Sequence, residues 1–362
     1  MITLASLIER FAPDCLARDG HALLPGHRHA LQAMQHCRTR LAPRMLAQCS
    51  ACDEQVTVPH SCGHRSCPHC QHFESQRWLE RQTQRLVAGD YFLVTFTLPA
   101  QLRPLAWQHQ RVVYDLLMEC AWQTVRTFSQ NHRHLRGSPG AISVLHTHAR
   151  DLHFHPHVHL VIPGAALDPR QRLWRTLPAK ARYLFNHKAL AKVFRAKLLA
   201  ALHAQGLLAP AVPMKWVVDC KRVGDGRKAL VYLGRYLYRG VIQEHDIISC
   251  DGVNVTYRWR DGKTGQAMQR TVAGATFLWL VLQHVLPKGF RRARNHGFLH
   301  PNSKRLNALL QLLVFRPPSV PATSTPRPTF VCRCCGAPMS IVKRRMPPDL
   351  GEPPGGATQA RT

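Results

Sequence analysis

Two Cys-x-x-Cys pairs constrain the N-terminal quarter of this chain more strongly than any other feature of its sequence. Cys49 and Cys52 form the first pair, Cys67 and Cys70 form the second, and 14 residues separate them. This spacing is close to that of tetrahedral zinc sites built from two thiolate knuckles. The sequence therefore predicts a structural zinc ion held by Cys49, Cys52, Cys67 and Cys70. Cys62 and His64 lie inside the intervening loop and are alternative ligands.

The distribution of the 13 cysteines favours metal binding over disulfides, because eight of them crowd into two short segments. The second segment holds Cys332 and Cys335, a lone Cys-x-x-Cys for which no other half is visible. A signal peptide is not expected, since Glu9 and Arg10 interrupt the first apolar stretch. We therefore expect a cytoplasmic protein, where thiols stay reduced.

The charge of the chain points to a polyanionic partner. Lys and Arg number 49 against 20 Asp and Glu, a formal net charge of +29. Such an excess suits nucleic acid above all. A membrane partner is not expected, because the sequence has no apolar run of about 18 residues.

The basic residues are concentrated in an acid-free stretch. Between Asp261 and Asp349 there are 14 Lys or Arg and no acidic residue. Cations interspersed with Phe290, His296 and Phe298 suit single-stranded or distorted DNA, because charge tracks the backbone and rings stack on bases. A solvated basic face is the alternative. The candidate DNA-binding residues are Lys288, Arg291, Arg292, Arg294, Lys304 and Arg305.

The segment His155-Pro156-His157-Val158-His159 predicts a metal site on a strand. Side chains alternate along a strand, so His157 and His159 share one face while Val158 faces the core. Paired neutral imidazoles are good ligands for a divalent metal ion, here expected to be Mg²⁺ or Mn²⁺. His155 is the candidate third ligand, although Pro156 makes a regular strand through it doubtful. Weaker candidates are His146, His148 and His153.

The segment around Tyr232 predicts a helix with a catalytic face. Tyr232, Tyr236 and Arg239 fall within about 60° of one another on a helical wheel, whereas Leu230, Leu233 and Leu237 fall on a different face. A tyrosine hydroxyl could attack a phosphodiester polarised by the metal ion, leaving a 5′ phosphotyrosine and a free 3′ hydroxyl. Arg239 or Arg235 could balance the phosphate charge.

Interleaved strands and helices predict an α+β catalytic core. We expect a helical lead-in and zinc-binding domain at 1–87, the catalytic domain at 88–316, and a flexible linker and tail at 317–362 that carries the lone Cys-x-x-Cys. Within them, hydrophobic periodicity predicts a set of elements. The expected strands are 91–98, 141–148, 157–162, 215–219 and 253–259, and the expected helices are 73–86, 112–128, 185–203, 276–285 and 306–314.

At these motifs the chain resembles the two-tyrosine rolling-circle transposases of the insertion-sequence ninety-one type, within the superfamily of His-hydrophobe-His (HUH) nucleases. The resemblance runs from His36-Cys37-Arg38-Thr39 to His296-Gly297-Phe298-Leu299. Its intermediate motifs follow in the family order and include Cys67-Pro68-His69-Cys70, the histidine segment, Tyr232-Leu233-Gly234-Arg235-Tyr236, and His284 to Phe290.

The resemblance implies an HUH-type nuclease core with an antiparallel sheet and flanking helices, preceded by a small zinc-binding domain. It maps the metal ligands to His157 and His159 and the nucleophiles to Tyr232 and Tyr236. One departure is the stretch Cys62-Gly63-His64-Arg65-Ser66-Cys67, which differs from the usual Cys-Arg-Asn-Arg-His-Cys. The expected activity is nicking and transfer of single-stranded DNA at mobile-element ends, in the bacterial cytoplasm and at the nucleoid when the protein is bound to DNA.

Three other functions remain open from the residues. A plasmid replication initiator or relaxase would share the chemistry, but the zinc cluster and the segment from His284 to Phe290 favour the transposase. An amidohydrolase also uses His-x-His, yet it has no use for paired tyrosines. A non-catalytic, zinc-dependent DNA-binding regulator would leave both motifs incidental. The sequence does not determine the oligomeric state.

Overall fold

The computed structural model describes residues 2–178, 181, 183–238, 240–262, 264–314 and 329–348, and for residues 236 and 238 it describes the backbone alone. Its centre is an antiparallel sheet with strand order β7-β6-β4-β5-β3-β8, in which β12 also pairs with β4. The strands are β3 (Tyr91–Thr97), β4 (Ser138–His148), β5 (Phe154–Pro163), β6 (Ala165–Asp168), β7 (Leu173–Thr176), β8 (Val218–Arg222) and β12 (Ala293–Gly297).

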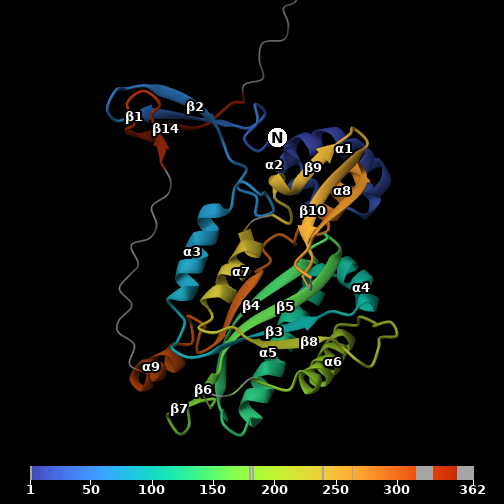
Figure 1. The fold of residues 1–362 in the computed structure, drawn as a ribbon, viewed down its shortest axis with the longest axis vertical. Coiled ribbons are helices and arrows are strands. Elements are labelled where there is room, and N and C mark those ends of the chain that lie inside the picture. The colour runs from blue at the N-terminus through green and yellow to red at the C-terminus, as the bar shows by residue number, and fades with distance from the viewer. Residues whose placement is uncertain are drawn as a thin grey trace, which may run out of the picture.

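Helices cover both faces of this sheet (Figure 1). On one face, apolar residues that alternate along β3 and β5 pack against α4 (Arg103–Gln108), α5 (Gln110–Asn131) and α6 (His187–Ala204). On the other face lie α3 (His72–Thr83), α7 (Arg227–Tyr238) and α9 (Lys304–Leu313). The helices α3 and α7 approach closely because Gly234 has no side chain to hold back Trp78. The α+β class and the antiparallel core are therefore as predicted.

The N-terminal helices do not stand apart as a separate unit. The helices α1 (Leu4–Asp19) and α2 (Pro25–His36) share a hydrophobic core with α8 (Gly274–Leu282) and with β10 (Asn254–Arg260). Phe11, Val255 and Phe277 are buried in this core. Gly274 lies directly against the Phe11 ring. The strands β9 (Ile247–Cys250), β10 (Asn254–Arg260) and β11 (Ala267–Ala273) form a three-stranded sheet beside it. The boundary expected at residue 87 is thus crossed by extensive packing.

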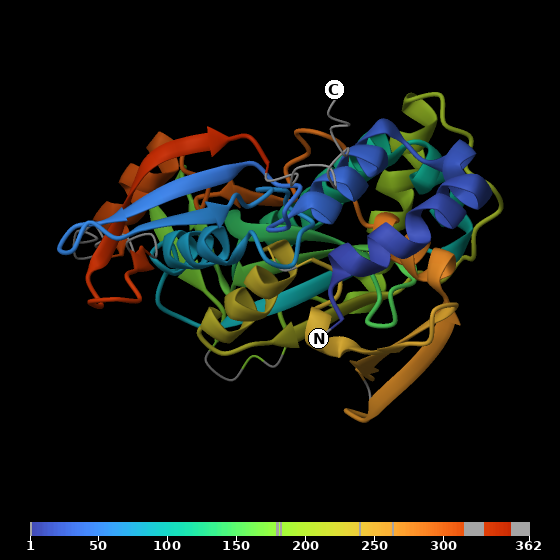
Figure 2. The same cartoon turned by 90° about the horizontal axis from the view of Figure 1, so that it is seen from above.

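A small four-stranded sheet joins two segments that are far apart in the sequence. Its order is β13-β14-β1-β2, with β1 (Arg44–Cys49), β2 (Gln55–Pro59), β13 (Phe330–Val331) and β14 (Pro338–Met346). We call it the ribbon. It projects from the body of the protein, on the side opposite the β9–β11 sheet (Figure 2). The prediction of a linker and tail over 317–362 is therefore wrong for residues 330–346. The linker at 317–328 and the tail from 349 lie outside the described residues.

Some elements begin at a different residue from the one that hydrophobic periodicity predicts, because local contacts hold the chain in another conformation. The strand expected at 215–219 begins at Val218, because Trp216 is held by its indole N–H on the Pro213 carbonyl, 3.0 Å away. Short 3₁₀ turns occur at Gly20–Ala22, Ala100–Leu102 and Glu244–Asp246. In the part of the chain that the structure describes, no helix combines the length and apolar character needed to cross a bilayer.

Candidate active site and cysteine clusters

Three histidines from two adjacent strands converge at one end of the central sheet. His157 and His159 alternate with Val158 on β5, and His146 lies directly opposite His157 on β4. Their ligand nitrogens lie within 4.8 Å of one another. The same sheet face continues into the buried side chains of Val144 and Val161, which pack beneath α7. The histidine cluster therefore stands where the apolar face beneath α7 ends.

Hydrogen bonds fix the orientation of two of these rings. The Nδ1 atom of His159 lies 2.8 Å from the Thr95 hydroxyl, and Nδ1 of His157 lies 2.6 Å from the His155 carbonyl oxygen. The carbonyl can only accept, so Nδ1 of His157 carries the proton and Nε2 keeps its lone pair. Nε2 of His159 is buried and has no hydrogen-bond partner among the described residues. Such bonds on the outer ring nitrogen are typical of metal-ligating histidines.

Burial keeps all three imidazoles neutral at pH 7. Desolvation lowers the pKa of His157 to about 4, and it lowers the pKa of His146 and His159 well below their ordinary value. The neighbouring histidines lower these pKa values further, and Arg292 does so for His146 and His157. Neutral rings offer lone pairs to a cation, so the cluster fits a divalent metal ion. Of the two ions expected, this all-nitrogen donor set fits Mn²⁺ better than Mg²⁺, which prefers oxygen ligands and an octahedral shell.

The structure does not bring His155, the expected third ligand, into this group of ligand nitrogens, and His146 completes the group instead. The pairing of β4 with β5 shifts register between His146 and His148. The His155 ring lies 5.3 Å from that of His157, centroid to centroid, but its nitrogens do not join those of the cluster. Nδ1 of His155 lies 2.6 Å from an Arg103 guanidinium nitrogen. The other two weak candidates are also engaged elsewhere, His148 against the ring of His284 and His153 with Asp151.

The helix α7 brings Tyr232 to the histidines. Leu230, Leu233 and Leu237 are buried in the core between α7 and the sheet, as the helical wheel predicts. The Tyr232 ring lies 6.1 Å from the ring of His159 and 6.3 Å from that of His146, centroid to centroid. Tyr236 follows one turn later on the same helix, but its side chain is not among those described. Arg239 lies outside the described residues.

Cationic cavities flank this site. Tyr232 lines a cavity of about 410 Å³ together with Arg150, Arg235, Arg258 and Arg260. A second cavity of about 740 Å³ lies between α3 and β12, and its cationic lining is Arg65, Arg81, Arg85, Arg291, Arg292 and Arg294. Hydropathy did not single out Arg81 and Arg85, because they appear as the polar face of an ordinary helix.

The six predicted DNA-binding residues separate into two groups. Arg291, Arg292 and Arg294 line the second cavity, but two of them also have structural contacts. The Arg292 guanidinium donates to the Leu145 carbonyl at 2.9 Å, and that of Arg294 contacts the Asp115 carboxylate. Lys288 is exposed on the preceding turn. Lys304 and Arg305 begin α9, outside the cavity lining.

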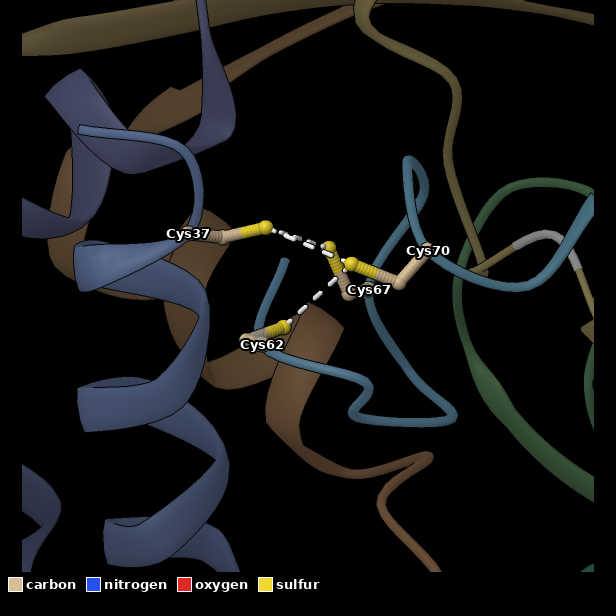
Figure 3. A group of neighbouring side chains, drawn as sticks. All are labelled: Cys37, Cys62, Cys67 and Cys70. Carbon is tan, nitrogen blue, oxygen red and sulfur yellow. Dashed lines mark hydrogen bonds between the residues drawn. The ribbon is translucent and has the colours of Figure 1, made fainter. Parts of the chain in front are cut away.

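Four cysteines cluster where α2 meets the loop before α3 (Figure 3). Cys37 ends α2, and Cys62, Cys67 and Cys70 come from the loop. Their sulfur atoms lie 3.4 Å (Cys37–Cys70) to 3.6 Å (Cys62–Cys70 and Cys37–Cys67) apart. Zinc–sulfur bonds of about 2.3 Å imply tetrahedral edges of about 3.8 Å, so this group fits zinc.

The predicted ligand set of Cys49, Cys52, Cys67 and Cys70 is therefore wrong, because its two pairs belong to different clusters. Cys49 and Cys52 lie in the ribbon with Cys332 and Cys335. Cys62, an alternative in the sequence, is part of the first cluster. His64 is not, since its Nδ1 faces the Ser66 amide at 3.2 Å. The position of Cys37 could have been noticed from the motif His36-Cys37-Arg38-Thr39, but it precedes the paired spacing.

Comparison with known proteins gives a consistent result. Residues 140–306 match the family described as "Putative transposase", and residues 7–98 match the "Transposase zinc-binding domain". The chain is 32% identical over 327 residues to "Putative transposase y4qJ" of Sinorhizobium fredii (strain NBRC 101917 / NGR234), covering 84% of this chain and 81% of that protein.

A second relative is "Transposase for insertion sequence element IS801" of Pseudomonas savastanoi pv. phaseolicola. It is 28% identical over 272 residues, which cover 69% of this chain and 64% of that protein. No solved structure matches the chain. The zinc-binding match, together with the cysteine clusters, supports structural zinc.

Proposed function

Since the chain belongs to the insertion-sequence ninety-one type of transposases, whose substrate is DNA, we propose that it cuts one DNA strand with Tyr232 and holds the 5′ end covalently. The tyrosine oxygen would attack the scissile phosphorus as the bond to the leaving 3′ oxygen breaks. The phenol gives up its proton and the leaving oxygen takes one up, so the products are a 5′ phosphotyrosine and a free 3′ hydroxyl. The covalent link conserves the phosphodiester bond energy, and a 3′ hydroxyl can later reverse the step without a nucleotide cofactor.

The observation that carries this proposal is the position of Tyr232 against the histidine cluster. The Tyr232 ring lies about 6 Å from the rings of two histidines, and α7 is fixed on the sheet by its buried leucines. His146, His157 and His159 would hold a divalent ion, which when bound neutralises charge on the scissile phosphate. A phosphate resting between the ring cluster and the phenol would therefore meet both the nucleophile and the charge that makes it reactive.

The surroundings of Tyr232 support a single strand as substrate. The cavity beside it carries four arginines and the single acid Asp246, so it suits a phosphate backbone. A nucleotide strand can enter such a cavity when its bases are unpaired, whereas a duplex is too wide. Tyr236, one helical turn further along, would hold the second strand end in the transfer step.

A covalent-capture experiment tests the proposal. Purified protein is incubated with labelled single-stranded DNA that carries the element end, in Mn²⁺ or Mg²⁺, and is then denatured in detergent. We expect a protein–DNA adduct that is lost in the Tyr232→Phe, Tyr236→Phe double variant. Tyr183→Phe is the matched control, since Tyr183 is 67% exposed and lies outside the site. Metal-dependent cutting without an adduct would overturn the tyrosine mechanism.

A further inference from the structure

We propose that the ribbon contains a second zinc site, formed by Cys49 and Cys52 from the N-terminal part of the chain and by Cys332 and Cys335 from the C-terminal part. Half of this site lies outside the matched zinc-binding domain, which ends at residue 98. The proposal concerns the architecture of the protein and does not depend on the nuclease mechanism.

The arrangement of the four sulfurs is the first argument. All four lie within 4.8 Å of one another, with Cys49 and Cys335 3.4 Å apart and Cys52 and Cys332 3.7 Å apart. These distances approach the roughly 3.8 Å edge of a zinc–thiolate tetrahedron and are far longer than a disulfide bond of about 2.05 Å. All four cysteines are free thiols in this structure. Four thiolates select a soft, tetrahedral ion, and zinc is the common one.

The two Cys-x-x-Cys turns are built alike, and this is the second argument. In each turn the amide of the first cysteine donates to the carbonyl five residues later, from Cys49 to Glu54 at 2.8 Å and from Cys332 to Ala337 at 2.9 Å. In each turn the fourth residue after the first cysteine has positive φ, +57° at Asp53 and +74° at Gly336. Each turn therefore curls its two thiols toward the same side, as a metal knuckle requires.

One turn also shows a hydrogen bond to sulfur. The Ala51 amide points at the Cys49 sulfur, 3.4 Å away. In the first cluster the His64 amide points at the Cys62 sulfur at the same distance. In both places the amide belongs to the second residue after the cysteine. Amide donors favour the charged thiolate over the thiol, so both sites stabilise the form of cysteine that binds metal.

The small core of the ribbon is the third argument. Its buried hydrophobic cluster has four members, and two of these are cysteines: Ala47, Cys49, Cys332 and Met339. A sheet of fewer than about 40 residues cannot bury enough apolar surface to be stable, and such small units usually need a metal or a disulfide. In the ribbon, β1 pairs with β14, and nearly the whole length of the chain separates these two strands in the sequence. A metal ion between the two turns would supply the stability that packing lacks.

Alkylation of the native protein tests the site with an internal control. Cys52, Cys334 and Cys335 are all exposed, but Cys334 does not belong to the cluster. With zinc present, we expect a maleimide to modify Cys334 rapidly and Cys52 and Cys335 at least tenfold more slowly, as measured by peptide mass spectrometry. A chelator should remove this difference. Equal labelling rates of the three thiols with zinc present would overturn the proposal.

Metal analysis gives a second, independent measurement. The Cys332→Ser, Cys335→Ser variant should contain one zinc equivalent per chain less than the wild type, whereas Cys334→Ser should contain the same amount. Retention of all zinc by the double variant would contradict the proposal. Cobalt substitution distinguishes loss of one metal site from misfolding of the whole protein. In the double variant the thiolate-to-cobalt absorption should be about half that of the wild type, while the circular dichroism of the main body is unchanged.

Discussion

His146 and His157 face each other directly across β4 and β5, with ring centroids 5.2 Å apart. The two residues are separated by only one hairpin, yet nothing in the periodicity of either strand links them. The register of the β4–β5 hairpin places His146 opposite His157, and the alternation of side chains along β5 places His159 on the same face. A three-ring cluster thus arises from a two-residue motif and one neighbour on the adjacent strand.

The role of His146 can be separated from that of His155. We expect His146→Ala to weaken Mn²⁺ binding by about 100-fold or more, since loss of a direct ligand should cost at least as much as loss of its supporting hydrogen bonds. His155→Ala should change it less than threefold, because the His155 ring is held by Arg103. Calorimetric titration of both variants measures this. Equal loss in the two variants would show that His155 belongs to the metal shell.

The hydrogen bond between Thr95 and His159 should tune the same site. Thr95→Val keeps a β-branched side chain on β3 but removes the hydroxyl that holds the ring of His159. We expect Mn²⁺ affinity to fall by about 10- to 100-fold with little change in stability. Thr97→Val is the matched control one pleat further along, opposite His157. Undiminished affinity in Thr95→Val would show that the hydroxyl does not position the ring.

Acid should destabilise the N-terminal core through His27. Burial lowers the pKa of His27 to about 4, against an opposing effect of the Val285 carbonyl. The unfolded chain takes up the proton near pH 6.5 and the folded protein only near pH 4, so stability is full above pH 6.5 and falls as the pH drops toward 4. At pH 5 the loss from this residue is about 2 kcal/mol.

The variant His27→Gln isolates that contribution. The glutamine carbonyl can still accept the Leu24 amide, which lies 3.0 Å from Nδ1 of His27, but glutamine does not titrate. Urea unfolding at pH 7.5 and pH 5 should show a pH dependence smaller by about 2 kcal/mol in the variant. A pH dependence identical to that of the wild type would mean that His27 is protonated without cost in the folded state.

Gly297 is required where β12 meets β4. Its φ is +57°, and a Cβ atom there would lie 1.8 Å from the carbonyl oxygen of Pro139, a backbone atom that cannot rotate away. We expect Gly297→Ala to lower the free energy of unfolding by more than about 3 kcal/mol. Gly206 has a φ of +70° and open space around it, so Gly206→Ala should lower the free energy of unfolding by only the backbone strain of about 1–2 kcal/mol. Similar losses in both variants would show that β12 can shift.

Arg65 ties the first cysteine cluster to the turn before β12. Its guanidinium donates to the carbonyls of Leu286, Pro287 and Phe290, at 2.6–3.2 Å. Arg65→Met would leave these acceptors unpaired, so we expect a loss of about 3 kcal/mol in the free energy of unfolding. The exposed Arg40→Met should change stability by less than about 0.5 kcal/mol. Chemical unfolding of the two variants decides the matter.

The sequence predicted what depends on local spacing and missed what depends on distant pairing. Alternation on β5 placed His157 and His159 together, and the helical wheel placed the leucines of α7 on a face separate from that of Tyr232. The third histidine depends on the β4–β5 register, which no single strand encodes. The cysteine pairs were assigned by proximity along the chain, whereas the fold combines Cys49 with Cys335, 286 residues away.

Because β1 pairs with β14, the ribbon cannot be completed until the C-terminal segment has been synthesised on the ribosome. When Cys49 and Cys52 leave the exit tunnel, about 280 residues remain to be made before Cys332 and Cys335 follow, a wait of about 15–55 s at ordinary rates of translation. During that time the first two thiols lack their partners, and β1 has β2 beside it but lacks β14 on its other side. A polypeptide cut short before residue 332 by a frameshift or a nonsense codon therefore leaves Cys49 and Cys52 without their partner thiols, and we expect proteases to cleave this exposed segment.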